Sequence, residues 1–210
     1  MTDKEIGKIC ERFNITNYSI NNDKSIDVDD DVDFMDLYSD SYLEEFPINF
    51  NVINGEFNCF ANKLNSLKGA PTEIHGDFDA GINNLNSLEY FPKYIKGNIF
   101  LRSNNLESLK FLPKNINGVL DIANNNIRNF SYFPNVKEIF YLNNNPIQKL
   151  WLLFENFNFI EYFNELDIIQ ENDKKVILER LNYFLIDIGE NELSEENPLF
   201  RSIKDHYNIK

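Results

Sequence analysis

The stretch GEFNCFANKLNSLKGAP (residues 55–71) is followed, 21 residues later, by GDFDAGINNLNSLEYFP (residues 76–92). Glycine, phenylalanine, asparagine, two leucines and proline occupy the same places in both segments. Two further units continue the register from Gly97 and Gly118, and a fifth begins one residue early at Val136. An isoleucine stands two residues before each of the four glycines, at Ile53, Ile74, Ile95 and Ile116. A repeat of this regularity predicts a solenoid of stacked units.

Each unit contains a short apolar alternation that predicts a strand. Phe57 and Cys59 are two residues apart, which places both side chains on one face of an extended segment. The matching pairs are Phe78 and Ala80, Ile99 and Leu101, Leu120 and Ile122, and Phe140 and Leu142. Because one strand cannot bury its apolar face alone, we expect the copies to stack in a parallel sheet about 4.8 Å apart.

The remaining fixed positions have separate physical roles. We expect the asparagine side chains to bond the backbone of neighbouring turns as a buried ladder. Glycine suits a place where the backbones of two turns approach closely, and proline suits an extended return segment that needs no donor. The asparagines are Asn62, Asn83, Asn104, Asn125 and Asn145, and the prolines are Pro71, Pro92, Pro113 and Pro134.

This pattern resembles the leucine-rich repeat family, and more narrowly the short repeats of tailed bacteriophages and some bacteria, which have the form G-x-F-x-C-x-x-N-x-L-x-S-L-x-x-x-P. The units from Gly55 and Gly76 follow that form, whereas Glu138 replaces the glycine in the last unit. The resemblance implies an α/β leucine-rich repeat solenoid with a parallel β-sheet on its concave face, an N-terminal helix-hairpin cap and a C-terminal helical cap. Such a resemblance implies little about activity, because a fold does not determine function.

The flanks of the repeats divide the chain into three parts. Residues 1–31 are expected to form the N-terminal cap, with a helix over 2–13 that opens on a Thr2–Glu5 capping box and a hairpin over 18–29. Residues 32–154 are the repeats, the first of them degenerate. Residues 155–210 are the C-terminal cap and tail. Helices are expected over 158–168 and over 173–188, the second between an Asp173 N-cap and Gly189, and the tail 199–209 is read as a last strand or as disordered.

The composition is strongly acidic, with 34 Asp and Glu against 20 Lys and Arg and a net charge of −14. This charge argues against direct binding of nucleic acid or of anionic membranes and leaves open a basic protein surface as partner. The chain has neither a run of about 18 apolar residues nor a signal-like start, so we expect a cytoplasmic protein. Cys10 and Cys59 are interpreted as buried hydrophobes in a reducing compartment, with a disulfide between them as the alternative.

The sequence offers little support for catalysis or for a cofactor. Its two histidines are His75, at a variable and exposed place between repeats, and His206, in the tail. No cysteine follows residue 59, which disfavours the leucine-rich-repeat ubiquitin ligases, whose catalytic domain needs a nucleophilic cysteine after the repeats. No phosphate-binding glycine motif is present. We therefore expect a protein that is not an enzyme and holds no cofactor.

An acidic run precedes the repeats and is formed by Asp27, Asp29, Asp30, Asp31, Asp33, Asp36 and Asp40. Alternate carboxylates resemble a calcium loop, but Phe34 and Asp40 stand where an EF-hand needs glycine and glutamate. We interpret the run as the solvated face of a strand whose Ile26, Val28 and Val32 point inward. A metal site and an acidic docking patch for a basic partner are the alternatives.

The outward positions of the strands supply the candidate binding residues. If Phe57 and Cys59 point inward, their neighbours form three outward columns along the stack. From these columns we predict a partner-binding face made of Phe60, Asp77, Asp79, Phe100, Arg102, Val119, Asp121, Ile139 and Tyr141. Exposed apolar clusters rimmed by polar groups mark interaction sites. The alternative is that the C-terminal cap or tail covers these residues.

The function expected from these features is non-catalytic binding of a protein partner through the concave sheet. Its phage-type resemblance and a composition typical of an AT-rich genome suggest a virus-encoded protein that engages or inhibits a host factor in the host cytoplasm. A second hypothesis is an acidic mimic of nucleic acid that occupies a DNA- or RNA-binding protein. Salt distinguishes the two, because a charge mimic loses its partner steeply as salt rises.

Overall fold

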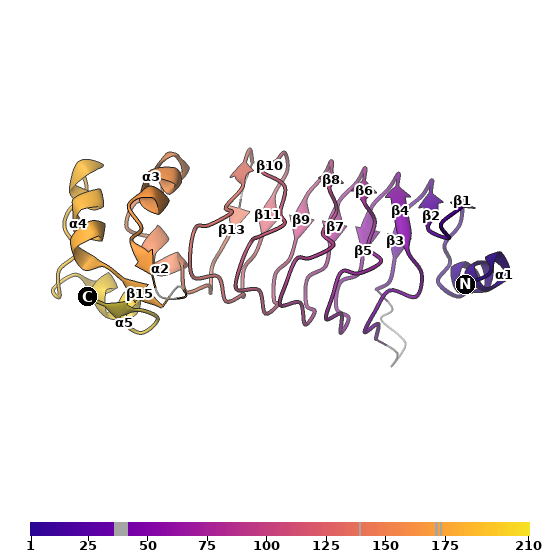
Figure 1. The fold of residues 1–210 in the computed structure, drawn as a ribbon, viewed down its shortest axis with the longest axis horizontal. Coiled ribbons are helices and arrows are strands. Elements are labelled where there is room, and N and C mark those ends of the chain that lie inside the picture. Colours follow the sequence, from indigo (N-terminus) through magenta and orange to yellow (C-terminus); the bar gives the residue numbers. More distant parts are fainter. Residues whose placement is uncertain (36–41, 139, 171, 173) are drawn as a thin grey trace.

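The computed structural model describes residues 1–35, 42–138, 140–170, 172 and 174–210. The chain forms a mixed α/β solenoid of about five turns of stacked parallel strands, with helices gathered at both ends of the stack (Figure 1). The long axis of the molecule runs across the strands, so each turn of the chain contacts mainly the turns before and after it. This arrangement confirms the solenoid predicted from the 21-residue repeat.

The predicted strands pair in one parallel ladder of six. Its order is β13-β11-β9-β7-β5-β3, and the pairs Val32↔Phe57, Phe57↔Phe78, Phe78↔Ile99, Ile99↔Leu120 and Leu120↔Phe140 give its register. This register is the one predicted from the repeat, including the degenerate first unit at Val32. The strands are β3 (Val32–Asp33), β5 (Phe57–Asn58), β7 (Phe78–Asp79), β9 (Ile99–Phe100), β11 (Leu120–Asp121) and β13 (Phe140–Tyr141).

A second parallel ladder, which the sequence analysis did not predict, runs beside the first. Each return segment contributes a strand just after its proline, so each turn of the solenoid carries two strands joined by a corner at the glycine. The inward residues of this ladder are the repeated isoleucines. Its strands are β4 (Phe50–Ile53), β6 (Glu73–Ile74) and β8 (Tyr94–Ile95) in one sheet, and β10 (Asn115–Ile116) with β12 (Asn135–Val136) in another.

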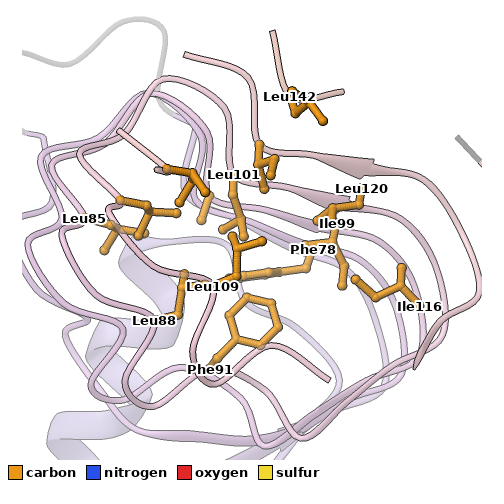
Figure 2. Close-up of a cluster of buried hydrophobic side chains, with 14 of the residues drawn as sticks. Phe78, Leu85, Leu88, Phe91, Ile99, Leu101, Leu109, Ile116, Leu120 and Leu142 are labelled. Atoms are coloured by element: carbon orange, nitrogen blue, oxygen red, sulfur yellow. The ribbon is translucent and has the colours of Figure 1, made fainter. Parts of the chain in front are cut away.

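The interior is a continuous stack of apolar side chains. Figure 2 shows Phe78, Leu85 and Leu88 of one unit packed with Ile99, Leu101 and other residues of the next turns. Phe78 and Leu85 are fully buried. Burial of one such side chain contributes about 1.5–3 kcal/mol, and each turn depends on its neighbours for that burial.

The glycine column is required by the close approach of successive turns. A Cβ atom added to Gly76 would lie 2.6 Å from the carbonyl oxygen of Gly55, and one added to Gly97 would lie 2.7 Å from that of Gly76. Distances under about 3 Å are closer than real Cβ contacts allow. The corner between the two ladders therefore leaves no room for a side chain at Gly76 or Gly97, as the sequence predicted.

The asparagine ladder is present and is hydrogen-bonded at every rung. Asn104 Oδ1 accepts from the Leu85 N–H at 3.0 Å, and its Nδ2 donates to the carbonyls of Ala80 at 2.9 Å and Leu101 at 3.1 Å. Asn83, Asn125 and Asn145 repeat this pattern and are buried as well. Each asparagine thus joins backbone groups of its own turn to those of the turn before it.

The N-terminal segment matches its prediction closely. Helix α1 (Asp3–Arg12) begins with the Thr2–Glu5 capping box and buries Ile6 and Cys10. Strands β1 (Tyr18–Ile20) and β2 (Ile26–Val28) form the antiparallel hairpin, and β2 then pairs in parallel with β4. The hairpin therefore extends the second ladder at its N-terminal end, before the first full repeat.

The C-terminal segment departs from its prediction in three places. The helix expected over 173–188 is α4 (Leu178–Asp187), because Lys175 and Val176 pair into a sheet instead; Asp173 lies outside the described residues, and Gly189 has the expected positive φ of 87°. The helix expected over 158–168 is divided and shorter. The tail, expected to be a strand or disordered, is mostly helical and ends in one short strand, β16 (Asn208–Ile209). The remaining elements are α2 (Gln148–Trp151), η1 (Phe157–Phe159), α3 (Ile160–Glu165), β14 (Ile169–Gln170), β15 (Lys175–Val176), α5 (Pro198–Lys204) and β16 (Asn208–Ile209).

Two further sequence expectations concern cysteines and membranes. Cys10 and Cys59 are both fully buried and are not joined by a disulfide. Among the described residues, no helix has the length and apolar character needed to cross a bilayer.

Candidate partner-binding face

The first ladder, formed by β3, β5, β7, β9, β11 and β13, presents one face of the solenoid to the outside. We call the outward side chains of these strands and of the residues that flank them the strand face. Its central column runs Asn58, Asp79, Phe100, Asp121 and Tyr141, one residue from each successive strand, as the pairing register shows. Acidic and aromatic side chains therefore alternate at neighbouring rungs, about 4.8 Å apart. The sequence predicted this column residue by residue.

The aromatic end of the strand face is open to solvent. Tyr141 is 47% exposed, and Phe100 and Val119 are half-buried. Ile139, which the sequence placed in the same cluster, lies outside the described residues. The Tyr141 ring is therefore available for contact on the strand face.

The C-terminal tail docks elsewhere on the solenoid. Tyr207 Oη donates to the Arg128 carbonyl at 2.7 Å, and Arg128 Nη1 donates to the His206 carbonyl at 2.9 Å. Arg128 belongs to the turn that follows the Asn125 rung, and not to the strand face. The alternative in which the tail covers Tyr141 is therefore wrong for this residue.

Arg102 organises the centre of the strand face. Its guanidinium carbon lies 5.0 Å from the Phe60 ring centre and 5.9 Å from the Phe100 ring centre, and Nη1 lies 3.7 Å from Asp121 Oδ2. Gly81 stands between Phe60 and Arg102 in the stack. A Cβ there would lie 3.2 Å from atoms of both side chains. The missing side chain at Gly81 thus lets Arg102 reach across two turns, a contact that repeat spacing alone does not predict.

Asp77 and Asn98 have a structural task that the sequence analysis missed. Asp77 Oδ1 accepts from the Asn98 N–H at 2.7 Å and Oδ2 accepts from Asn98 Nδ2 at 3.0 Å. Asn98 Oδ1 in turn accepts from the Val119 N–H at 2.8 Å. These bonds form a second polar ladder beside the glycine column. Asp77 therefore stabilises the stack in addition to any role on the surface.

Asp79 and Asp121 are held in place by local turns. Asp79 Oδ1 accepts from the Gly81 N–H at 2.8 Å, and Asp121 Oδ1 accepts from the Ala123 N–H at 3.0 Å. Burial raises the pKa of Asp79, the charges of Asp121 and Asp77 raise it further, and the Gly81 N–H and Arg102 oppose the shift. The negative charge of Asp79 therefore lowers the stability of the folded state.

The acidic run before the repeats is solvent-exposed at Asp29, Asp30, Asp31 and Asp33, as predicted, and half-buried at Asp27. Ile26, Val28 and Val32 are buried, as the interpretation required. However, three of the carboxylates accept hydrogen bonds from the next turn: Asp27 from Asn51 and Val52, Asp29 from Asn54, and Asp31 from the Glu56 N–H. Asp36 and Asp40 lie outside the described residues. No group of metal-ligating side chains is found among the residues that the structure describes.

The other candidate reactive groups have ordinary surroundings. His75 is exposed, with Nε2 3.8 Å from Glu73 Oε2, and its ring packs edge-on to Tyr94. The Cys59 thiol is fully enclosed in the core, and burial raises its pKa. A buried thiol in apolar surroundings is inert.

Comparisons of the chain with protein-family models, with curated proteins and with solved structures found no match. The arrangement of the strand face is therefore the main guide to function.

Proposed function

We propose that this chain is a non-catalytic protein-binding module that engages its partner through the strand face. The observation that carries the proposal is the exposed Tyr141, aligned with Phe100 and Asp121 on a rigid ladder. Large aromatic side chains on rigid elements are typical anchors of protein interfaces. The ladder fixes their spacing before any partner binds, which lowers the entropic cost of association.

The charge of the face supports a partner with basic groups. Asp77 and Asp79 lie on one turn and Asp121 lies two turns later, with Arg102 on the turn between them, and the whole chain carries a net charge of −14. Perturbed pKa values cluster at functional sites. The uncharged Asn58 fills the same column position one turn earlier and makes the same bond to the backbone. The negative charge of Asp79 is therefore not needed for that bond, and we interpret it as retained for binding.

The rival function is an acidic mimic of nucleic acid, and the same charge favours it. In that case the carboxylates supply most of the affinity and the aromatic side chains supply little. The strand face argues for the first function, because it exposes the large Tyr141 ring and because three carboxylates of the acidic run bind the neighbouring turn.

The finer identity of the fold is also a proposal. We infer a leucine-rich repeat solenoid of phage type from the repeat pattern, with the N-terminal helix and hairpin and the C-terminal helices acting as caps that protect the ends of the ladders. By the same resemblance we propose a virus-encoded protein that acts in the host cytoplasm on a host factor.

The experiment is affinity capture from the natural host with matched variants. Phe100→Ala with Tyr141→Ala should leave folding near native and weaken binding by at least roughly 30-fold, the equivalent of about 2 kcal/mol. Tyr132→Ala is the control, because Tyr132 is 62% exposed on a turn away from the strand face. Asp77→Lys with Asp79→Lys tests the rival, provided that circular dichroism shows the variant folded, because Asp77 also accepts hydrogen bonds from Asn98. A partner that tolerates the aromatic change, fails with the charge reversal and dissociates steeply with salt would establish the mimic instead.

A further inference from the structure

A cavity of about 410 Å³ lies at the edge of the solenoid, between the asparagine turns of the last two repeats and the C-terminal tail. The basic residues that line it are Arg128, Lys149 and His206, and none of the described residues in its lining is Asp or Glu. Asn126, Asn144 and Gln148 add side-chain amides. This is a concentration of basic groups in a chain whose net charge is −14.

Three separate segments build the cavity and hold it in shape. Arg128 follows the Asn125 rung, and Lys149 lies in α2, directly after the last repeat. His206 comes from the tail, fixed through its own carbonyl to Arg128 and through Tyr207 to the Arg128 carbonyl. The Asn144 N–H donates to Gln148 Oε1 at 3.0 Å, which anchors the far wall. The cavity therefore exists only because the tail returns to the repeats.

The donors that line the cavity match an oxyanion. Arg128 uses one of its guanidinium N–H groups on the His206 carbonyl, and planar guanidinium groups suit phosphate oxygens. Lysine, histidine and asparagine side chains can supply further N–H donors. Glu107 holds the place of Arg128 one turn earlier, so the basic lining is confined to the last two repeats. The volume falls in the range of small-ligand sites, about 300–1,000 Å³.

We propose that this cavity binds a small phosphate-bearing anion. The ligand would bridge the last repeats to the tail and so stabilise the C-terminal end of the solenoid. The site is separate from the strand face, and the proposal does not depend on the protein-binding function.

Titration with inorganic phosphate at constant ionic strength, with chloride as the balancing anion, tests the proposal. Nuclear magnetic resonance should show saturable shifts of the Asn126 and Asn144 amides and of the His206 ring. Lys149→Gln and His206→Gln should each weaken phosphate binding by roughly 10-fold or more, about 1.4 kcal/mol. Lys68→Gln removes the same charge from an exposed lysine of the first repeat and should leave the affinity unchanged.

Adenosine monophosphate, titrated in the same way, identifies the source of the phosphate. Shifts of the same residues at lower concentration indicate a phosphate ester as ligand, and exclusion of the nucleotide indicates the free anion. The proposal is overturned if phosphate produces no saturable shift. It is also overturned if Lys68→Gln weakens binding as much as Lys149→Gln, because the effect is then one of general charge.

Discussion

Asn104→Ala gives the sharpest test of the ladder that holds the turns together. Asn104 is 7% exposed and makes three hydrogen bonds to backbone groups. The Ala80 and Leu101 carbonyls keep a second amide donor each, from Asn83 and Asn125, whereas the buried Leu85 N–H has only Asn104 as its described partner. An orphaned buried donor costs about 1–3 kcal/mol, and the weakened carbonyl bonds add a smaller term.

Asn104→Ala is therefore expected to lower the free energy of unfolding by about 2–4 kcal/mol, which corresponds to a fall in melting temperature of roughly 4–15 °C for a chain of this size. Thermal unfolding followed by circular dichroism measures it. Asn105→Ala is the matched control, because Asn105 is exposed at the next position, and it should stay within about 0.5 kcal/mol of the wild type. Equal melting curves for the two variants would refute the ladder as a source of stability.

Three other outcomes are expected. Gly76→Ala should destabilise the fold by about 1–3 kcal/mol or more, because its Cβ would meet backbone 2.6 Å away. Gly7→Ala, in helix α1, should cost less, because its Cβ would meet only the hydroxyl end of the Tyr18 side chain, 3.3 Å away, and alanine favours the helix. A harmless Gly76→Ala would contradict the tight corner. Asp79→Asn should raise the melting temperature at neutral pH, because the raised pKa of Asp79 means that its charged form is disfavoured in the folded state. The gain should vanish below the ordinary aspartate pKa of about 3.9, where Asp79 is protonated in both the folded and the unfolded state. A gain that persists in acid would argue against this cause. Millimolar calcium should leave the melting temperature unchanged, and a rise of several degrees that a chelator reverses would revive the metal site at Asp29, Asp31 and Asp33.

The repeat was sufficient to predict the parts of the fold that depend on identical residues at identical places. The asparagine rungs and the glycine corner each follow from one residue type recurring at a fixed spacing, and the central column with Phe100 and Tyr141 follows from the same register. Stacking in register makes such positions neighbours, so sequence spacing translates directly into contact.

The second ladder escaped prediction because its strands carry almost no periodic signal. Four of its strands, β6, β8, β10 and β12, are two residues long with a single inward side chain, and alternation needs about four residues to be recognised. The C-terminal helices shifted for a related reason. Val176 is apolar and fits the helical pattern, but pairing with β14 and β16 places it in a strand instead.

The sequence did not predict contacts between side chains of different turns or segments, for another reason. Arg102 crosses to Phe60 because Gly81 leaves room, and Arg128 meets His206 because the tail returns to the repeats. Both depend on tertiary placement and not on a local pattern. Asp31 and Asp77 could be recognised in the sequence as acidic residues. Their hydrogen bonds could not be predicted, because the N–H groups that they accept from belong to the following turn.

A photo-crosslinking amino acid placed at Tyr141, compared with the same group at Tyr132, tests the central claim most directly. Both tyrosines are exposed, and only Tyr141 lies on the strand face. In an extract of the natural host, the strand-face account predicts a covalent adduct with one protein from position 141, lost when Phe100→Ala is added, and none from position 132. An adduct from position 132 alone would contradict partner binding through the strand face.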